Sequence, residues 1–413
     1  MAIRRTAHLD PPPQVGALRP WSMLVVTVVA QASGTVFQSA PAFLIPLLHS
    51  ERGVSLAQAG LLASAPTLGL VLTLVLWGAL TDRIGERWVI AGGMALTAAA
   101  AIGAVTASGY PALGAWLLLG GAASGSSNVA SGRVVVGWFP PQRRGLAMGI
   151  RQMCQPLGVA VAAIGIPALA AASGVGAAMA LPLVLTAVSA VLAALVVRDP
   201  PRPPRRAGHP AAANPYRGPA TLVRIHLASA LLVVPQFTVS IFGLVWLTAS
   251  GGMDLTVAGV VVAVAQFVGA LGRVAIGALS DRVGSRLRPL RMVAWCAAGV
   301  MVVLAASSFA PLWVAAAVLV AATGITVADN GLAYTAVAEI AGPFWSGRAL
   351  GMQNTGQFLA ASIVGPAVGA LITLVGYPLA FAAVALAPAA AVPLVPRDRR
   401  DTGEAAEAAT VAA

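Results

Sequence analysis

Three charged side chains interrupt long apolar stretches of the sequence: Arg133, Arg151 and Asp329. A charge at the centre of a helix in lipid costs about 2.5 to 3.5 kcal/mol even on the most lenient insertion scale, so a charge retained there indicates a function. A buried arginine offers a binding site for an anion or a carboxylate. A buried aspartate takes up a proton more readily than an exposed one, which suits it to carrying protons.

Asp329 is the only acid well inside an apolar stretch. It lies ten residues before Glu339, or about 15 Å along a helix that rises about 1.5 Å per residue. We therefore predict that Asp329 couples the protein to protons. The alternative is a permanent ion pair with Arg133 or Arg151.

The two deep arginines lie at different depths. Arg151 follows Arg144 by seven residues, about 10 Å of helix, and shares a helical face with Gln155. We predict that Arg151 binds an anionic solute or a carboxylate, with snorkelling to the membrane interface as the alternative. Arg133 precedes Trp138 by only five residues, so a substrate-binding role, a part in proton coupling, a gate contact and snorkelling are all open for Arg133.

Amide side chains recur at helical spacing in the same stretches. Gln31, Thr35 and Gln38 are spaced i, i+4, i+7 and so lie on one face of a helix. Such residues replace the water that a polar solute sheds, or they join helices to one another. Their concentration in some stretches favours a cavity, and the candidate solute-binding residues are Arg151, Gln155, Gln31, Gln38, Asn128, Gln353, Asn354, Gln357 and Asn330.

Transmembrane helices are the elements that must position these residues. The chain has 413 residues, of which 58% are hydrophobic and 9% charged, whereas soluble domains carry about a quarter charged residues. We predict an all-α membrane protein with twelve transmembrane helices, each needing about 20 apolar residues. The apolar stretches fall near 22–48, 56–80, 88–107, 111–136, 146–172, 176–197, 222–249, 255–279, 290–309, 312–338, 346–374 and 377–395.

Arginine placement predicts the orientation. All 25 basic residues are arginine, and 21 of them lie in the two tails or in the loops on one side of the membrane, with only Arg52 in a loop on the other side. The positive-inside rule then places both termini in the cytoplasm and a multi-pass protein in the plasma membrane. Because the positive charge is spread over these loops and not over one soluble face, we predict no nucleic-acid partner.

The chain divides into two halves of nearly equal length. A Pro- and Arg-rich segment, 198–221, reads as a cytoplasmic linker. We predict a cytoplasmic N-tail at 1–21, bundles of six helices at 22–197 and 222–395, and a cytoplasmic C-tail at 396–413.

Two sequence matches indicate that the halves are duplicates. The segment GALTDRIGER from Gly78 recurs as GALSDRVGSR from Gly277, 199 positions later. The segment RGLAMGIRQ from Arg144 also resembles GRALGMQN from Gly347. Matches at corresponding places in the two halves are typical of an internal repeat.

These features together resemble the major facilitator superfamily (MFS), and the resemblance covers residues 21–396. It implies an MFS fold of two pseudo-symmetric six-helix bundles and alternating access to a site between them. It also implies that charged residues of the repeated motif hold the cytoplasmic side closed, and we expect Arg273 to join the same gate layer. The predicted gate residues are Asp82, Arg83, Asp281, Arg282 and Arg273. Dipole and lipid-phosphate contacts are the alternative for the Asp and Arg pairs of the motif.

No reactive constellation, nucleotide-binding loop or metal-ligand spacing is present in the sequence, so we predict no enzyme activity, cofactor or metal. We predict a monomeric, proton-coupled importer of a small polar or anionic organic solute, with membrane lipid as its surroundings. Proton-driven efflux of drugs or amphipathic metabolites is the alternative. It is weakened because an arginine expected near Gly121 for drug exporters is absent. A transporter-like sensor or scaffold is a more distant alternative.

Overall fold

The structure, a computed structural model, describes residues 18–52, 56–201, 213–217, 219–250 and 252–397. Within these ranges the regular elements are all helices. Most of the predicted tails and much of the predicted linker lie outside the described residues. The all-α fold class predicted from the sequence is confirmed.

The described part of the first half contains six helices. They are α1 (Leu18–Arg52), α2 (Leu56–Ile84), α3 (Glu86–Thr106), α4 (Tyr110–Trp138), α5 (Pro141–Arg151) and α6 (Cys154–Val196). Helix α6 bends sharply at Ser173 and Gly174, where Gly174 has a φ of 79° that favours glycine. This one long helix therefore contributes to two passes through the bundle.

The second half is built in the same way. It contains α7 (Thr221–Val245), the π-helical turn η2 (Trp246–Ser250), α8 (Leu255–Val283), α9 (Leu287–Ser307), α10 (Leu312–Thr326), α11 (Asp329–Ala341), α12 (Ser346–Val384) and α13 (Leu386–Leu394). Helix α12 bends at Gly376, which also has a φ of 79°. The bend separates two passes, as the one in α6 does.

Ten helical stretches among the described residues are long and apolar enough to cross a membrane. Helix α4 is not among them because its Gly, Ser and Asn residues lower its mean hydropathy, although its 29 residues are long enough to span. The stretch Ser346–Leu394 counts once but turns back at Gly376. The path of the chain is therefore consistent with twelve passes.

Two of the predicted spans are interrupted within their length, whereas the sequence predicted continuous helices. The span 146–172 is interrupted at Gln152 and Met153, between α5 and α6. The span 312–338 is interrupted at Val327 and Ala328, between α10 and α11. Arg151 lies directly before the first break and Asp329 directly after the second. The breaks thus flank two of the three deep charges.

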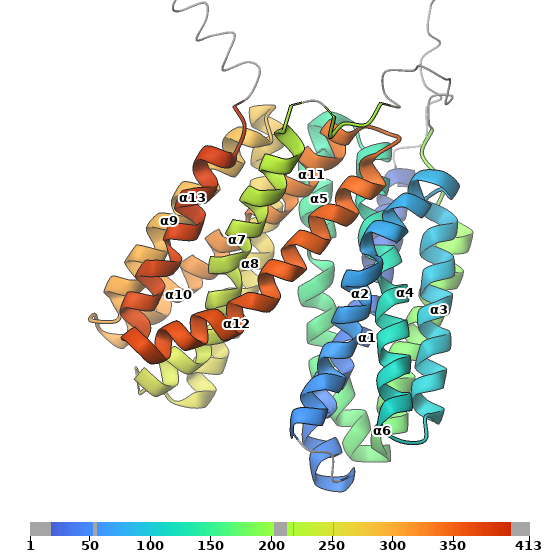
Figure 1. Cartoon of the computed structure of the whole chain (residues 1–413), viewed down its shortest axis with the longest axis horizontal. Helices are drawn as coiled ribbons and strands as arrows, with labels where there is room; N and C mark the ends of the chain where they lie inside the picture. Colours follow the sequence, from blue (N-terminus) through green and yellow to red (C-terminus); the bar gives the residue numbers. More distant parts are fainter. Residues whose placement is uncertain (1–17, 53–55, 202–212, 218, 251, 398–413) are drawn as a thin grey trace, which may run out of the picture.

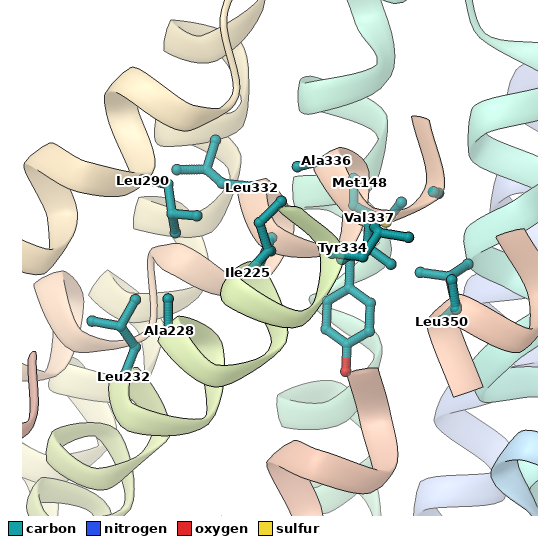
Figure 2. Packing of buried hydrophobic residues seen from close by; sticks show 14 of the residues in the cluster. Met148, Ile225, Ala228, Leu232, Leu290, Leu332, Tyr334, Ala336, Val337 and Leu350 are labelled. Atoms are coloured by element: carbon teal, nitrogen blue, oxygen red, sulfur yellow. The ribbon is translucent and has the colours of Figure 1, made fainter. Parts of the chain in front are cut away.

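The two halves touch at one end of the molecule. The start of α1, the end of α6, the start of α7 and the end of α13 lie at this end, which we call the termini end (Figure 1). From there the two bundles diverge toward the opposite end, the far end (Figure 1). A buried apolar cluster with side chains from both halves fills the termini end, and Met148, Leu290, Val337 and Leu350 belong to it (Figure 2).

Glycines of the repeated motif make the contact between the halves possible. A Cβ atom on Gly78 of α2 would overlap the backbone oxygen of Gly347 in α12, and one on Gly145 of α5 would overlap that of Gly277 in α8. Two backbones approach this closely only where no side chain stands between them. The pairs α2/α12 and α5/α8 are the same crossing repeated in the duplicated halves.

We expect Gly78→Ala to destabilise the protein by about 1 to 3 kcal/mol, because the added methyl group meets backbone that has little room to move. The matched control is Gly92→Ala in α3, where a Cβ would have no neighbour within 4 Å and the change favours the helix. The measurement is the apparent melting temperature of detergent-purified protein at one scan rate. A lowered value for Gly92→Ala and an unchanged value for Gly78→Ala would refute the packing argument.

Candidate functional site

A polar cavity lies between the two halves and holds about 440 Å³ of empty space, solvent at its mouth included. Nine of its lining side chains can donate or accept hydrogen bonds, and none of the lining side chains carries a formal charge. Its wall consists of Gln31, Asn128, Gln152 and Gln155 from the first half and Val233, Gln236, Phe237, Asn330, Tyr334, Asn354, Gln357, Phe358 and Ala361 from the second.

The cavity wall of the first half is a hydrogen-bonded network between α1 and α4. Gln31 donates from Nε2 to Asn128 Oδ1 at 2.8 Å and accepts from Ser131 Oγ at 2.9 Å. Nearby, Gln38 donates to Ser124 Oγ at 3.0 Å. The i+3 spacing of Asn128 and Ser131 places both on the face of α4 that meets α1.

The wall of the second half is a network among α7, α11 and α12. Asn330 donates to Gln236 Oε1 at 3.0 Å, and Gln357 donates to Asn330 Oδ1 at 2.9 Å. The Tyr334 hydroxyl lies 2.6 Å from both Asn354 Oδ1 and Gln357 Oε1. These contacts fix the amides in place before any solute arrives, which limits the ordering that binding requires.

Arg151 lies one layer behind the cavity wall and is 1% exposed. Its Nε donates to Ser131 Oγ at 2.8 Å and its Nη1 to Gln152 Oε1 at 2.7 Å, while Nη2 contacts the Asn128 carbonyl. The guanidinium also lies 5.4 Å from the centre of the Tyr334 ring in the other half. In the part of the chain that the structure describes, no carboxylate pairs with Arg151, so its charge is balanced only by dipoles and an aromatic ring.

Arg133 belongs to the termini end and not to the cavity. It forms ion pairs with Asp82 at 2.5 Å and with Glu86 at 2.9 Å, and it donates to the Pro343 carbonyl at 3.1 Å. It thereby joins α2, α3 and α4 to the segment that leads into α12. An ion pair between Arg133 and Asp329, open from the sequence, is not formed in this conformation.

Asp329 is 1% exposed and forms no ion pair with any residue that the structure describes. Within the same residues, neither carboxyl oxygen accepts a hydrogen bond of normal geometry, although the backbone N–H groups of Asp329 and Asn330 lie close. Arg273 of α8 lies near enough to interact electrostatically, but it donates from Nη1 to the Gln152 carbonyl at 2.8 Å instead. The pair with Arg151 that the sequence left open is likewise not formed.

The aspartates of the repeated motif bind backbone N–H groups of the opposite half. Asp82 accepts from the backbone of Gly347 at 2.9 Å and of Arg348 at 3.0 Å, near the start of α12. Asp281 accepts from the backbone of Gly145 at 2.9 Å and of Leu146 at 2.8 Å, in α5. A carboxylate near a helix start also complements the helix dipole. We call these two sets of contacts the aspartate clamps.

The matching pattern of the two clamps shows how the duplication works in space. Gly145 and Gly347 are corresponding glycines of the second sequence match, and each donates to the motif aspartate of the other half. Each clamp therefore combines a close backbone approach with a buried charge that is paired across the interface.

The comparisons with known proteins agree with this architecture. The family model of the Major Facilitator Superfamily matches residues 24–365. The chain belongs to the Major Facilitator Superfamily. The membership suggested by the repeated GxLxDRxG segments is thereby confirmed.

Individual MFS relatives share this fold along most of their length. The chain is 50% identical over 386 residues to a protein of Mycobacterium tuberculosis (strain H37Rv) described as an uncharacterised MFS-type transporter, covering 93% of this chain and 86% of the relative. The crystal structure of a human organic anion transporter superposes with a TM-score of 0.71 at 17% identity, covering 94% and all of the two chains. A fucose:proton symporter of E. coli gives a TM-score of 0.69 at 16% identity, covering 90% of this chain and 98% of that one.

Several of the predicted solute-binding residues line the cavity of this MFS protein: Gln155, Gln31, Asn128, Asn354, Gln357 and Asn330. Gln38 is bonded to Ser124 and is not part of the lining. Gln353 lies toward the termini end, where its Oε1 contacts His226 Nδ1. The polar helical face therefore indicated which side chains point toward the interior, but it did not indicate how deep along the helix each one lies.

The sequence predictions did not include the aromatic side chains of the cavity. Tyr334 follows Asn330 by four residues, so helical spacing already placed it on the same face of α11. Phe237 and Phe358 carry no polar signal that distinguishes them from core residues. Tyr334 matters most because its hydroxyl closes one network and its ring contacts Arg151 of the other half.

The gate arginines differ from those that the repeated motif suggested. The side chains of Arg83 and Arg282 are exposed at the ends of α2 and α8. The clamps instead contain Arg348, whose Nε lies 3.0 Å from Asp82, and Arg286, whose Nη1 lies 2.6 Å from Asp281. Glu339 adds a pair with Arg144 at 3.2 Å and one with Arg286 at 3.5 Å.

We expect Asp82→Asn to loosen the termini end, because the substitution removes the charge that two backbone N–H groups and two arginines surround. Losing one member of a buried ion pair costs about 3 to 5 kcal/mol. The measurement is the rate at which a maleimide labels Leu350→Cys, whose parent side chain is 1% exposed in the cluster between the halves. The background carries Cys296→Ala, because Cys296 is exposed and Cys154 is buried.

Labelling should accelerate at least tenfold, since each 1.4 kcal/mol changes a population about tenfold. The matched control is Asp254→Asn, which neutralises an exposed aspartate that caps α8 at the far end, and asparagine also caps helices well. If Leu350→Cys is labelled at the same rate with and without Asp82→Asn, the aspartate clamp does not hold the termini end closed.

Proposed function

We propose that the protein is a secondary active transporter that moves a small polar organic solute by alternating access and couples this movement to protons. The observation that carries the proposal is the cavity itself, which is lined from both halves and lies between bundles joined only at the termini end. Rocking of the halves about this site would expose it first to one side of the membrane and then to the other.

The chemistry of the wall supports a solute with several hydrogen-bonding groups. Amides both donate and accept, so they suit hydroxyl, carbonyl and carboxylate groups alike. Phe237 and Phe358 offer apolar faces to the carbon skeleton of the solute.

Arg151 supports the inclusion of anionic solutes. Its guanidinium has no carboxylate partner among the described residues, and it contacts both Gln152 and Tyr334 of the cavity wall. The positive charge therefore acts on the cavity from directly behind it. A side chain that swings aside during transport would bring the guanidinium to the solute.

The arrangement of arginines supports cytoplasmic termini in a plasma-membrane protein. Arg83, Arg87, Arg143 and Arg144 all lie near the termini end of their helices, as the positive-inside rule requires of cytoplasmic loops. In that orientation the clamps close the cytoplasmic side and the bundles diverge toward the outside. This is the conformation in which an importer would receive its solute and its proton. We propose that the protein does so as a monomer.

We expect purified protein in liposomes to accumulate at least one member of a panel of neutral and anionic metabolites when the outside is acidic. The panel includes polyols, sugars, sugar acids and short carboxylic acids. No accumulation of any member under either polarity of the proton gradient would contradict the proposal. Accumulation only with the inside acidic would indicate efflux.

Asp329→Asn should abolish accumulation driven by the gradient while solute–solute exchange across the membrane continues, because asparagine has no titratable proton but preserves the shape of the site. Asp254→Asn serves as the control and should accumulate solute as the parent does. Full accumulation by Asp329→Asn would exclude proton coupling through this residue.

A further inference from the structure

Two buried charged residues that do not line the cavity, Asp329 and Arg273, lie near enough to interact electrostatically. Among the residues placed by the structure, the carboxyl group of Asp329 finds no hydrogen bond of normal geometry and Nε of Arg273 finds no acceptor. Both residues belong to the second half, one at the start of α11 and one in α8. A buried cation and a buried carboxyl group that lie near each other without pairing indicate that one of them has another partner in this conformation.

Arg273 donates instead to the backbone carbonyl of Gln152, which has no donor from its own helix. In an unbroken helix the Gln152 carbonyl would accept from residue 156, but that residue is Pro156, which has no N–H. Nη1 of Arg273 donates to the Gln152 carbonyl oxygen at 2.8 Å in place of that N–H, and the donor and acceptor belong to opposite halves. A Cβ on Gly149 would lie 2.5 Å from the Arg273 backbone oxygen, so α5 and α8 cross tightly at this point.

We propose that Arg273 is a positioning residue that exchanges partners during transport. It binds the Gln152 carbonyl while the termini end is closed and the Asp329 carboxylate when the termini end opens. Asp329 then carries its proton in the closed state and releases it in the open state. The inference rests on the proposed function and assigns the residue through which the proton governs the conformation.

The partner exchange follows from which half each group belongs to. Separation of the halves at the termini end carries the Gln152 carbonyl away with the first half, while Asp329 stays beside Arg273 in the second. Arg273 is protonated throughout, so it must find a new acceptor, and an ionised Asp329 provides a charge-assisted one. The proton leaves Asp329 for the water that enters from the termini side, and Arg273 gives up none.

The other titratable groups around Asp329 and Arg273 have partners of their own or lie beside Arg273, so the response to pH is assigned to Asp329 and Arg273. Tyr334 of α11 and Cys154 at the start of α6 lie near Arg273. Arg151 of α5 faces Tyr334 and is bonded within the first half. Arg144 of α5 is paired with Glu339, and Arg133 of α4 is paired with Asp82. Acidification therefore favours the closed termini end, and alkaline conditions favour the open one.

Electron–electron distance measurements across the far end test this exchange. Spin labels are placed at Ser108→Cys after α3 and Phe309→Cys after α9, both exposed, in full-length protein with Cys296→Ala in lipid nanodiscs. A closed termini end gives a long distance between the labels and an open one gives a short distance. The long component should grow as the pH falls in the parent protein.

Asp329→Asn should hold the long component at every pH. Arg273→Gln should also lose the pH response, because Asp329 then lacks its counter-charge in both conformations. Asp254→Asn and Arg224→Gln, which change exposed residues outside the site, should respond to pH as the parent does. A normal response in Arg273→Gln together with loss in Asp329→Asn overturns the partner exchange and leaves the transport proposal intact.

Pro156→Ala gives a second route that changes no charge. It returns an N–H at residue 156 that can donate to the Gln152 carbonyl, and this N–H competes with Arg273 for that acceptor in the closed state. We expect the distances to shift toward the short component at each pH while the pH response persists. An unchanged distribution overturns the exchange even if Arg273→Gln does not fold. Failure of the parent to move any solute in liposomes would instead overturn the transport proposal.

Discussion

A charge buried in lipid must find a partner, and the rest of this structure follows from how each buried charge does so. Arg133 is paired with carboxylates, and Arg151 with hydroxyl, amide and carbonyl groups. Asp82 and Asp281 find backbone N–H groups of the opposite half. The contacts of Asp82 and Asp281, and that of Arg133 with the Pro343 carbonyl, reach the opposite half, so satisfying these charges also closes the termini end. Asp329 is the exception, because its nearest cation is bound elsewhere.

The duplicated sequence makes the closure symmetrical but the interior asymmetrical. Both crossings use a glycine against a glycine and an aspartate against a pair of N–H groups, as a duplicated gene would encode. The deep charges do not repeat in this way: Arg151 lies in the first half and Asp329 in the second. In the proposed transport cycle, a symmetrical gate around an asymmetrical centre would let the halves rock together while solute and proton occupy different groups.

Much of the fold could be predicted from the sequence, because the bilayer imposes span length and the repeated glycines and aspartates are local signals. The amides at helical spacing likewise predicted most of the polar cavity wall. The helix breaks were missed because a single Pro156 or a short turn after Thr326 is common in membrane helices. The partners of Arg133 and Arg273 were missed because side-chain pairing depends on which helices cross and at what depth. For the same reason the sequence indicated Arg83 and Arg282 at the clamps, where the structure has Arg348 and Arg286.

The proposed proton coupling requires a neutral, protonated Asp329 in the conformation that is closed at the termini end. Infrared difference spectroscopy measures this most directly, because a protonated carboxyl group has a carbonyl stretching band that a carboxylate lacks. We predict a protonated-carboxyl band at neutral pH that disappears in Asp329→Asn, persists in Asp254→Asn, and weakens as rising pH opens the termini end. A spectrum of the closed state in which Asp329→Asn removes only carboxylate bands would contradict the account.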